Sequence, residues 1–194
     1  MTKQLPVWDL QHDAFILHTR ARDLDSALRA KLRLLTIKPV MDSWMVGVLD
    51  NDYANPGRTG RVHVFVLYDP AVREAGWAHH GLEPLAWATV YHAQYKERSL
   101  NHTMRCNEVS IFVHPGQRGR GLGTRLLSFA KDQLKHTKRR FVAIPDTEAG
   151  CRCYAKSGVI DVSDWIPVST LDDPVVAADD LELMFACEEE YGRG

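Results

Sequence analysis

The sequence predicts a mixed α+β fold, with a mostly antiparallel central sheet of about seven strands flanked by about four helices. Two observations carry this prediction. Residues 14–20, 61–68 and 84–93 are apolar, partly alternating stretches with turn residues between them, and the meander of 61–68 and 84–93 suggests antiparallel pairing. Residues 106–144 then follow the pattern strand, helix, strand, which indicates one parallel crossover.

The first half of the chain carries two predicted helices beside these strands. Residues 24–37 are expected to form one, because Asp23 or Asp25 can cap its start and Pro39 ends it. Its predicted buried face carries Leu28, Leu32 and Leu35. A second helical segment is expected over 41–49, and a polar loop is expected over 94–105.

The second half begins with a strand over 106–113, which leads into a glycine-rich turn at 117–123. An amphipathic helix follows, with Leu126, Leu127, Ala130 and Leu134 at helical spacing. The remaining predicted elements are a short strand at 140–144, a helix at 148–156, and strands at 159–165 and 181–186.

Length and composition favour one soluble domain covering residues 1–194. The apolar fraction is 45% and the charged fraction 25%, both ordinary for a globular protein. No apolar run is long enough to cross a membrane, and no apolar signal core opens the chain, so a cytoplasmic location is expected. The four cysteines have neither disulfide-scaffold nor zinc-site spacing, so reduced thiols and no metal are expected.

Charge is distributed unevenly along the chain although the formal net charge is only −1. Residues 116–140 hold eight Lys and Arg against one acid, whereas residues 151–194 hold ten acids against three Lys and Arg. This distribution indicates an anion-binding side and an acidic side, or two solvated faces. The overall balance argues against a nucleic-acid binder, which usually has a basic domain.

The glycine turn is the stretch with chemical content. A strand, a glycine turn and a helix start together present backbone N–H groups to a phosphate. A Walker A loop is excluded, because no glycine here is followed at the required spacing by Gly-Lys-Ser/Thr. The dinucleotide fingerprint is excluded as well, since Gly119, Gly121 and Gly123 are spaced GxGxG.

Two motifs in this order resemble the GNAT N-acetyltransferase superfamily. Residues 118–123, Arg-Gly-Arg-Gly-Leu-Gly, fit its R/Q-x-x-G-x-G/A signature, and a hydrophobic strand precedes them. Residues 153–159, Cys-Tyr-Ala-Lys-Ser-Gly-Val, are similar to its later helix-to-strand segment. The resemblance covers roughly residues 12–165. It implies a sheet that is splayed in the middle and an acetyl-CoA-dependent N-acetyltransferase.

The resemblance also implies where acetyl-CoA binds. Its pyrophosphate would meet the turn, its pantetheine arm would pair with the strand over 108–113, and some family members have an asparagine where this chain has Thr147. Lys131 and the run 135–140 are candidates for the 3′-phosphate, or a solvated face. The expected coenzyme-binding residues are Ile111, Phe112, Val113, Arg118, Gly119, Arg120, Gly121, Leu122, Gly123, Thr124 and Thr147.

Acyl transfer to an amine requires a proton acceptor for the amine and a proton donor for the departing thiolate. By resemblance, Tyr154 is the expected general acid, and Glu108, on the strand beside the thioester, is the expected base. Tyr91 and His92 are alternative bases on the neighbouring strand. The side-chain face of Glu108 depends on strand register, which the sequence does not determine.

The expected acceptor is a primary amine on a small molecule, an amino acid or a peptide, attacking directly in a ternary complex. Acidic residues near the end of the chain could attract such an amine: Asp161, Asp164, Asp172 and Asp173. Two alternatives stay open: a coenzyme-A-binding regulatory module without turnover, and an enzyme acting on nucleic acid or aminoacyl-tRNA. The oligomeric state is also open, with a homodimer among the alternatives.

Overall fold

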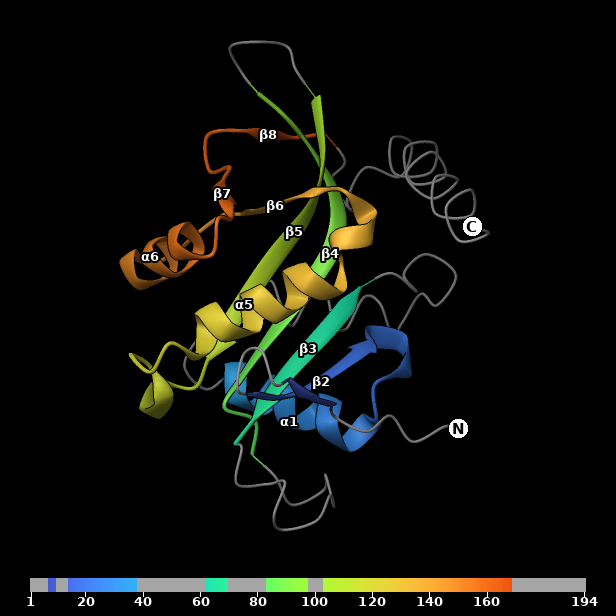
Figure 1. Ribbon diagram of the computed structural model, residues 1–194, viewed down its shortest axis with the longest axis vertical. Coiled ribbons are helices and arrows are strands. Elements are labelled where there is room, and N and C mark those ends of the chain that lie inside the picture. The colour runs from blue at the N-terminus through green and yellow to red at the C-terminus, as the bar shows by residue number, and fades with distance from the viewer. Residues whose placement is uncertain (1–6, 10–13, 38–61, 70–82, 98–102, 169–194) are drawn as a thin grey trace.

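The computed structural model describes residues 7–9, 14–37, 62–69, 83–97 and 103–168. In this part of the chain eight strands form one sheet in the order β1-β2-β3-β4-β5-β6-β7, and β8 pairs with β4 outside that order (Figure 1). The strands are β1 Val7–Asp9, β2 Ala14–Arg20, β3 His63–Tyr68, β4 Ala86–Lys96, β5 Thr103–Val113, β6 Arg140–Ala143, β7 Ile160–Asp161 and β8 Ile166–Pro167.

The predicted mixed, mostly antiparallel sheet is confirmed. Neighbouring strands from β1 to β5 pair antiparallel, and β4 and β5 form the longest ladder, from Ala86↔Val113 to Lys96↔Thr103. The two pairs that follow, β5 with β6 and β6 with β7, are parallel. The crossover expected over 106–144 is therefore the connection between β5 and β6.

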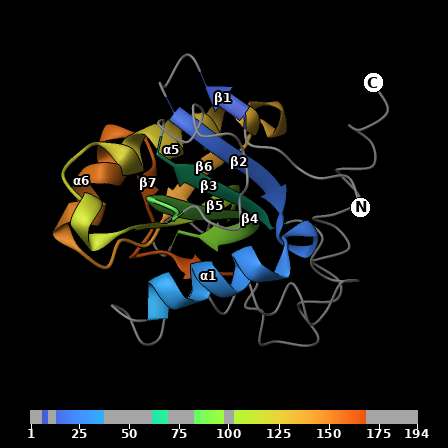
Figure 2. The ribbon, with the colours of Figure 1, turned by 90° about the horizontal axis from the view of Figure 1, so that it is seen from below.

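Helices cover both faces of the sheet. Figure 2 shows α1 (Ser26–Ile37) on one side of the strands, with α5 (Leu122–Gln133) and α6 (Glu148–Lys156) on the other. Among the described residues these are the three α-helices, and short 3₁₀ turns complete the list: η1 Ala21–Asp23, η3 Pro115–Gln117 and η4 Lys135–Thr137. We call the two sides of the sheet the α1 face and the α5 face.

The helix α1 begins two residues later than predicted, and of the two predicted caps it uses Asp25. The Asp25 Oδ1 accepts hydrogen bonds from the backbone N–H groups of Ala27 at 2.9 Å and Leu28 at 3.2 Å, which satisfies donors of the first turn. At its other end Thr36 Oγ1 accepts a hydrogen bond from Trp87 Nε1 at 3.0 Å. This buried bond ties α1 to the middle of the sheet.

Each face has its own core. The α5 face buries Leu126, Leu127, Ala130 and Leu134, as their spacing predicts, against β3, β4 and β5. The α1 face buries Leu28 and Leu32 against a cluster that includes Trp87 and Phe112. Leu35 is only partly buried. A third, smaller cluster lies where β4 and β5 extend beyond β3.

Two predicted boundaries are wrong. The polar segment 94–105 contributes the end of β4 and the start of β5, because pairing between the two strands outweighs the weak β-propensity of its polar residues. The strand predicted over 159–165 stops after Asp161, whose Oδ1 accepts a hydrogen bond from Ser163 N at 2.9 Å. Such a bond stabilises a turn rather than continued pairing.

Several predictions fall outside the described residues. These are the helix over 41–49, the strand over 181–186, and the acidic positions Asp172 and Asp173.

The start of α5 packs closely on its neighbours. A Cβ atom added to Gly123 would lie 2.9 Å from Cys153 Sγ of α6 and 3.4 Å from Ile111 Cδ1 of β5. Further along α5, Lys131 Nζ donates a hydrogen bond to the Ser157 carbonyl at 2.7 Å, just beyond the end of α6. The C-terminal half of α6 is thus in contact with α5 near both ends of α5.

A histidine pair lies at the other end of the α5 face. His18 Nε2 and His63 Nδ1 are 2.9 Å apart, and the His18 ring stacks on Phe65 with a centroid separation of 4.3 Å. Burial, together with the charges of Arg20 and His136, lowers the pKa of His18 to about 4.

This depressed pKa predicts acid lability. The unfolded chain binds a proton at His18 near the ordinary pKa of 6.5, and the folded chain does so only near 4, so stability falls as pH decreases between these values. Between pH 7 and pH 4.5, the free energy of unfolding of His18→Gln should fall by about 1–2 kcal/mol less than that of the wild type. Urea unfolding at a series of pH values measures the difference, and equal losses would contradict it.

Close packing at Gly123 predicts a compensating pair of substitutions. Gly123→Ala should destabilise the fold, because overpacking costs about 1–3 kcal/mol whereas replacing a helical glycine gains less than about 1. Adding Cys153→Ala removes the atom that the new methyl group meets. A double-mutant cycle in denaturant should then give a favourable coupling of about 1 kcal/mol. If the effects of the two substitutions on the free energy of unfolding are additive, the new methyl group does not clash with Cys153.

Candidate active site

The glycine turn joins β5 to α5. Gly119 has φ +80° and Gly121 has φ +74°, in the left-handed region that favours glycine. A Cβ atom added at either residue would meet nothing within 4 Å. The backbone conformation therefore favours glycine at 119 and 121, whereas close packing favours glycine at 123.

The helix α5 starts from this turn without a side-chain cap. Gly121 occupies the N-cap position and provides no side-chain cap for the first turn of the helix. The leading N–H groups, those of Leu122, Gly123 and Thr124, can therefore serve an anion, which the helix dipole also attracts. This donor set fits the pyrophosphate of acetyl-CoA.

Two arginines flank the donor set. Arg118 Nε donates to the Val113 carbonyl at 3.4 Å, and Arg120 donates to the Gln117 side-chain amide. Both residues are exposed. Their charges therefore stay at the turn, where they add to its positive potential.

The part of β5 that leads into the turn has a neighbouring strand on one side only. Its parallel pairing with β6 covers only Cys106↔Arg140, Asn107↔Phe141 and Glu108↔Val142. Figure 1 shows β6 turning away from β5 after this point. The β5 residues from 109 to 113 therefore face no described strand on that side, and this is the splay that the resemblance implies.

Alternation along β5 identifies which backbone groups face this gap. The His114 N–H donates to the Leu85 carbonyl at 3.0 Å, so even-numbered residues direct their backbone groups toward β4. Ile111 and Val113 direct theirs to the opposite side. An extended ligand arm could pair with these groups as an added strand.

Tyr154 of α6 reaches the same edge. Its side chain is buried against the α5-face core. Burial raises its pKa, a backbone hydrogen bond with Ile111 opposes that rise, and Cys153, Asp146 and Glu108 add to it. Because the hydrogen bond lowers the pKa, the Ile111 N–H donates and the phenol oxygen accepts. The hydroxyl proton remains available to a further partner.

The structure separates the three strand residues predicted to contact the coenzyme. Ile111 and Val113 are partly exposed and pack against the α5-face core. Phe112 is buried in the α1-face core, and its backbone pairs with Trp87. Phe112 is thus not brought to the gap.

Glu108 lies at the closed end of the gap, on the α1 face. It is 8% exposed, and its Oε2 accepts a hydrogen bond from Tyr95 Oη at 2.6 Å. Burial raises the pKa of its carboxyl, and hydrogen bonds from Tyr91 and Tyr95 partly offset that rise. A buried carboxylate with a raised pKa is suited to accept a proton.

The alternative bases differ in position. Tyr91 is the direct cross-strand partner of Glu108 and bonds to it, so it belongs to the same cluster. His92 points to the other face, where its Nδ1 lies 2.9 Å from Asn107 Oδ1. His92 and Glu108 are therefore not brought together.

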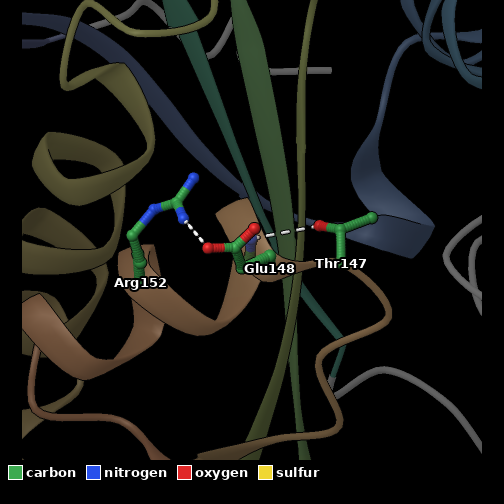
Figure 3. A network of polar contacts seen from close by, with 4 residues as sticks. Thr147, Glu148 and Arg152 are labelled. Atoms are coloured by element: carbon green, nitrogen blue, oxygen red, sulfur yellow. Dashed lines mark hydrogen bonds and ion pairs between the residues drawn. The ribbon is translucent and has the colours of Figure 1, made fainter.

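Thr147 is the N-cap of α6, as Figure 3 shows. Its Oγ1 accepts a hydrogen bond from the Gly150 N–H at 3.1 Å, and Glu148 forms an ion pair with Arg152 one turn along the helix. The Thr147 side chain thus supports the helix that carries Tyr154. Its hydroxyl proton can still reach a ligand.

Other predicted charges are placed less favourably. Lys131 is bonded to the end of α6, and residues 135–140 follow the far end of the twelve-residue α5, roughly 18 Å from the turn. Asp161 stabilises its own turn, and Asp164 is exposed.

Tyr95 was missed by the sequence prediction, which placed it in a loop. One signal was available: Tyr91 and Tyr95 are an even number of residues apart, so a continuous strand puts both on one face. In the described part of the chain no group of three or more His, Cys, Asp or Glu side chains is placed to hold a metal ion. No described helix is long and apolar enough to cross a membrane.

Solved structures similar to this one include three bacterial proteins. A predicted acetyltransferase with acetyl-CoA from Clostridium acetobutylicum is 16% identical, covering 82% of this chain and 97% of its own, with a TM-score of 0.49. A putative acetyltransferase with acetyl-CoA from Salmonella typhimurium is 20% identical, with coverages of 74% and 78% and a TM-score of 0.45. A ribosomal-protein-alanine N-acetyltransferase from Brucella melitensis is 15% identical, with coverages of 74% and 89% and a TM-score of 0.44.

No curated protein sequence matches this chain. The profile of the Acetyltransferase (GNAT) family, in contrast, matches residues 51–159, which is more than half of the 194-residue chain. The matched region runs from before β3 to just beyond α6, and it includes the glycine turn, the open edge of β5 and Tyr154. The chain therefore belongs to the GNAT acetyltransferase family, whose members take an acetyl group from acetyl-CoA.

Proposed function

We propose that this protein transfers the acetyl group of acetyl-CoA to a primary amine, which attacks directly in a ternary complex. Tyr154 is the proposed general acid and Glu108 the proposed general base. The acceptor is a small molecule, an amino acid or a peptide. The whole chain is proposed to form a single catalytic domain.

One observation carries the proposal. The unpaired edge of β5 leads from the uncapped start of α5 toward Glu108, and the Tyr154 hydroxyl bonds to that edge at Ile111. The site thus has three parts along one line. They are a phosphate-binding end, a strip of backbone donors and acceptors, and two proton-transfer groups. Acetyl-CoA has the corresponding parts in the same order, ending in an activated thioester.

The two candidate groups would act from opposite faces of the sheet. Tyr154 belongs to the α5 face, on which the glycine turn leads into α5, and its retained hydroxyl proton can be donated to a sulfur. Glu108 belongs to the α1 face, where its carboxylate can accept the proton of an approaching amine. The acid and the base would therefore approach the reacting atoms from opposite sides.

The phosphate assignment predicts a charge-specific effect at Gly121. Gly121→Asp should weaken acetyl-CoA binding by roughly 30-fold or more, because a carboxylate beside the pyrophosphate repels it. Gly121→Asn is the matched control. Both residues tolerate the left-handed region and have nearly the same shape, so they share any backbone strain.

Calorimetry of acetyl-CoA binding to both variants makes the comparison. We expect the asparagine variant to stay within about fivefold of the wild type, as the effect is electrostatic. Equal losses in the two variants would mean that shape, not charge, matters at this turn.

The chemical assignment predicts loss of turnover without loss of binding at Tyr154. Thiol release from acetyl-CoA should be measured with a panel of amines, amino acids and peptides. Tyr154→Phe should lower kcat by about 100-fold or more on each acceptor that works, because general acid catalysis supplies a factor of that size. Its affinity for acetyl-CoA should stay unchanged.

The same measurements separate an enzyme from a binding module. A module without turnover would bind acetyl-CoA, but it would not release thiol with any acceptor in the panel. A Tyr154→Phe variant with wild-type kcat would remove the acid assignment but leave the transferase activity.

A further inference from the structure

The Glu108 carboxylate is held by two phenols of β4. Tyr91 lies directly across from it in the ladder, and Tyr95 lies four residues further along β4 on the same face, with its Oη 2.6 Å from the Glu108 Oε2. Glu108 and Tyr95 are both buried, at 8% and 3% exposure. A short bond between two buried groups fixes the carboxylate in one orientation.

Small residues make this contact feasible. On the α1 face the pair Ala93↔Cys106 lies between the pair that contains Glu108 and the pair that contains Tyr95. Both of these intervening residues are buried, and neither has a side chain long enough to separate its neighbours. The long side chains of Tyr95 and Glu108 can therefore meet above them.

Tyr95 is itself firmly held. It lies beyond the part of β4 that pairs with β3, and β8 takes the vacant edge there, with Tyr95 opposite Pro167. The Val168 N–H adds a bond to the Gln94 carbonyl at 3.0 Å. The phenol stands on a strand that is paired on both sides, so its position is rigid.

While Glu108 is ionised, Tyr95 donates this hydrogen bond and the carboxylate accepts it. Burial and the neighbouring Glu108 raise the pKa of Tyr95, so this phenol stays protonated and acts as a donor. A carboxylate has about four acceptor positions, and two phenols leave some of them open. The remaining lone pairs can face an amine or a water.

Resting on the proposed role of Glu108 as the base, we infer that Tyr95 is a positioning residue of the acetyl transfer. It holds one carboxylate oxygen by its hydroxyl and stabilises the ionised form, so that the other oxygen is available to accept the proton of the acceptor amine.

Removing the Tyr95 hydroxyl should make Glu108 harder to ionise. In Tyr95→Phe the titration midpoint of Glu108, followed by NMR of ¹³C-carboxyl-labelled glutamate and assigned by its absence in Glu108→Gln, should rise by about one pH unit or more. This NMR titration needs no acceptor substrate. It therefore tests the contact independently of turnover.

The kinetic counterpart is the pH profile of kcat/KM. Its acid limb should move upward by the same amount in Tyr95→Phe, while the affinity for acetyl-CoA stays within about twofold. Tyr91→Phe provides a second variant with the same expected direction. Tyr68→Phe is the matched control, since Tyr68 is a buried tyrosine of β3 whose raised pKa arises from burial alone.

Three outcomes would overturn the inference, and each has a different meaning. An unmoved acid limb in Tyr95→Phe, with activity lost in Glu108→Gln, would leave Glu108 as the base and give Tyr95 no part in its action. A lower melting temperature with an unchanged NMR midpoint would make the tyrosine purely structural. Wild-type turnover in Glu108→Gln would remove the base assignment itself.

Discussion

The parallel pairing between β5 and β6 is only three residue pairs long, and the rest of the site depends on where it ends. After Glu108↔Val142 the two strands diverge, and the backbone groups of Ile111 and Val113 face a gap. Backbone groups along such a gap bond to side chains, to water or to a ligand. Here Tyr154 and Arg118 each provide one hydrogen bond. A ligand that pairs with an open edge would supply the others.

The two helices on the α5 face pack against each other beside this gap. Close contact at Gly123 brings the start of α5 onto Cys153 of α6, and Lys131 binds the end of α6. The two helices thus form one support for the glycine turn and for Tyr154. Substitutions that separate them would displace the turn and the phenol together, since rigid elements transmit small shifts.

The candidate base depends on the opposite face. The antiparallel ladder of β4 and β5 continues beyond β3, and β8 covers its edge. This extension creates a small apolar cluster around Cys106, and Glu108 is buried at its margin. The environment that desolvates the carboxylate is therefore built largely from residues distant in sequence, which is typical of groups with shifted pKa values.

Local pattern alone determined the order of the described elements from Ala14 to Asp161, the glycine turn and the family resemblance, because these signals lie within a few consecutive residues. It also indicated Glu108 and Tyr154 through their motif positions. Only the tertiary structure decided that Phe112 faces away from the gap, that His92 and Glu108 lie on different faces, and that the segment around Tyr95 is a strand. Register and pairing with a remote strand decide such questions, and a shift of one residue reverses every side chain.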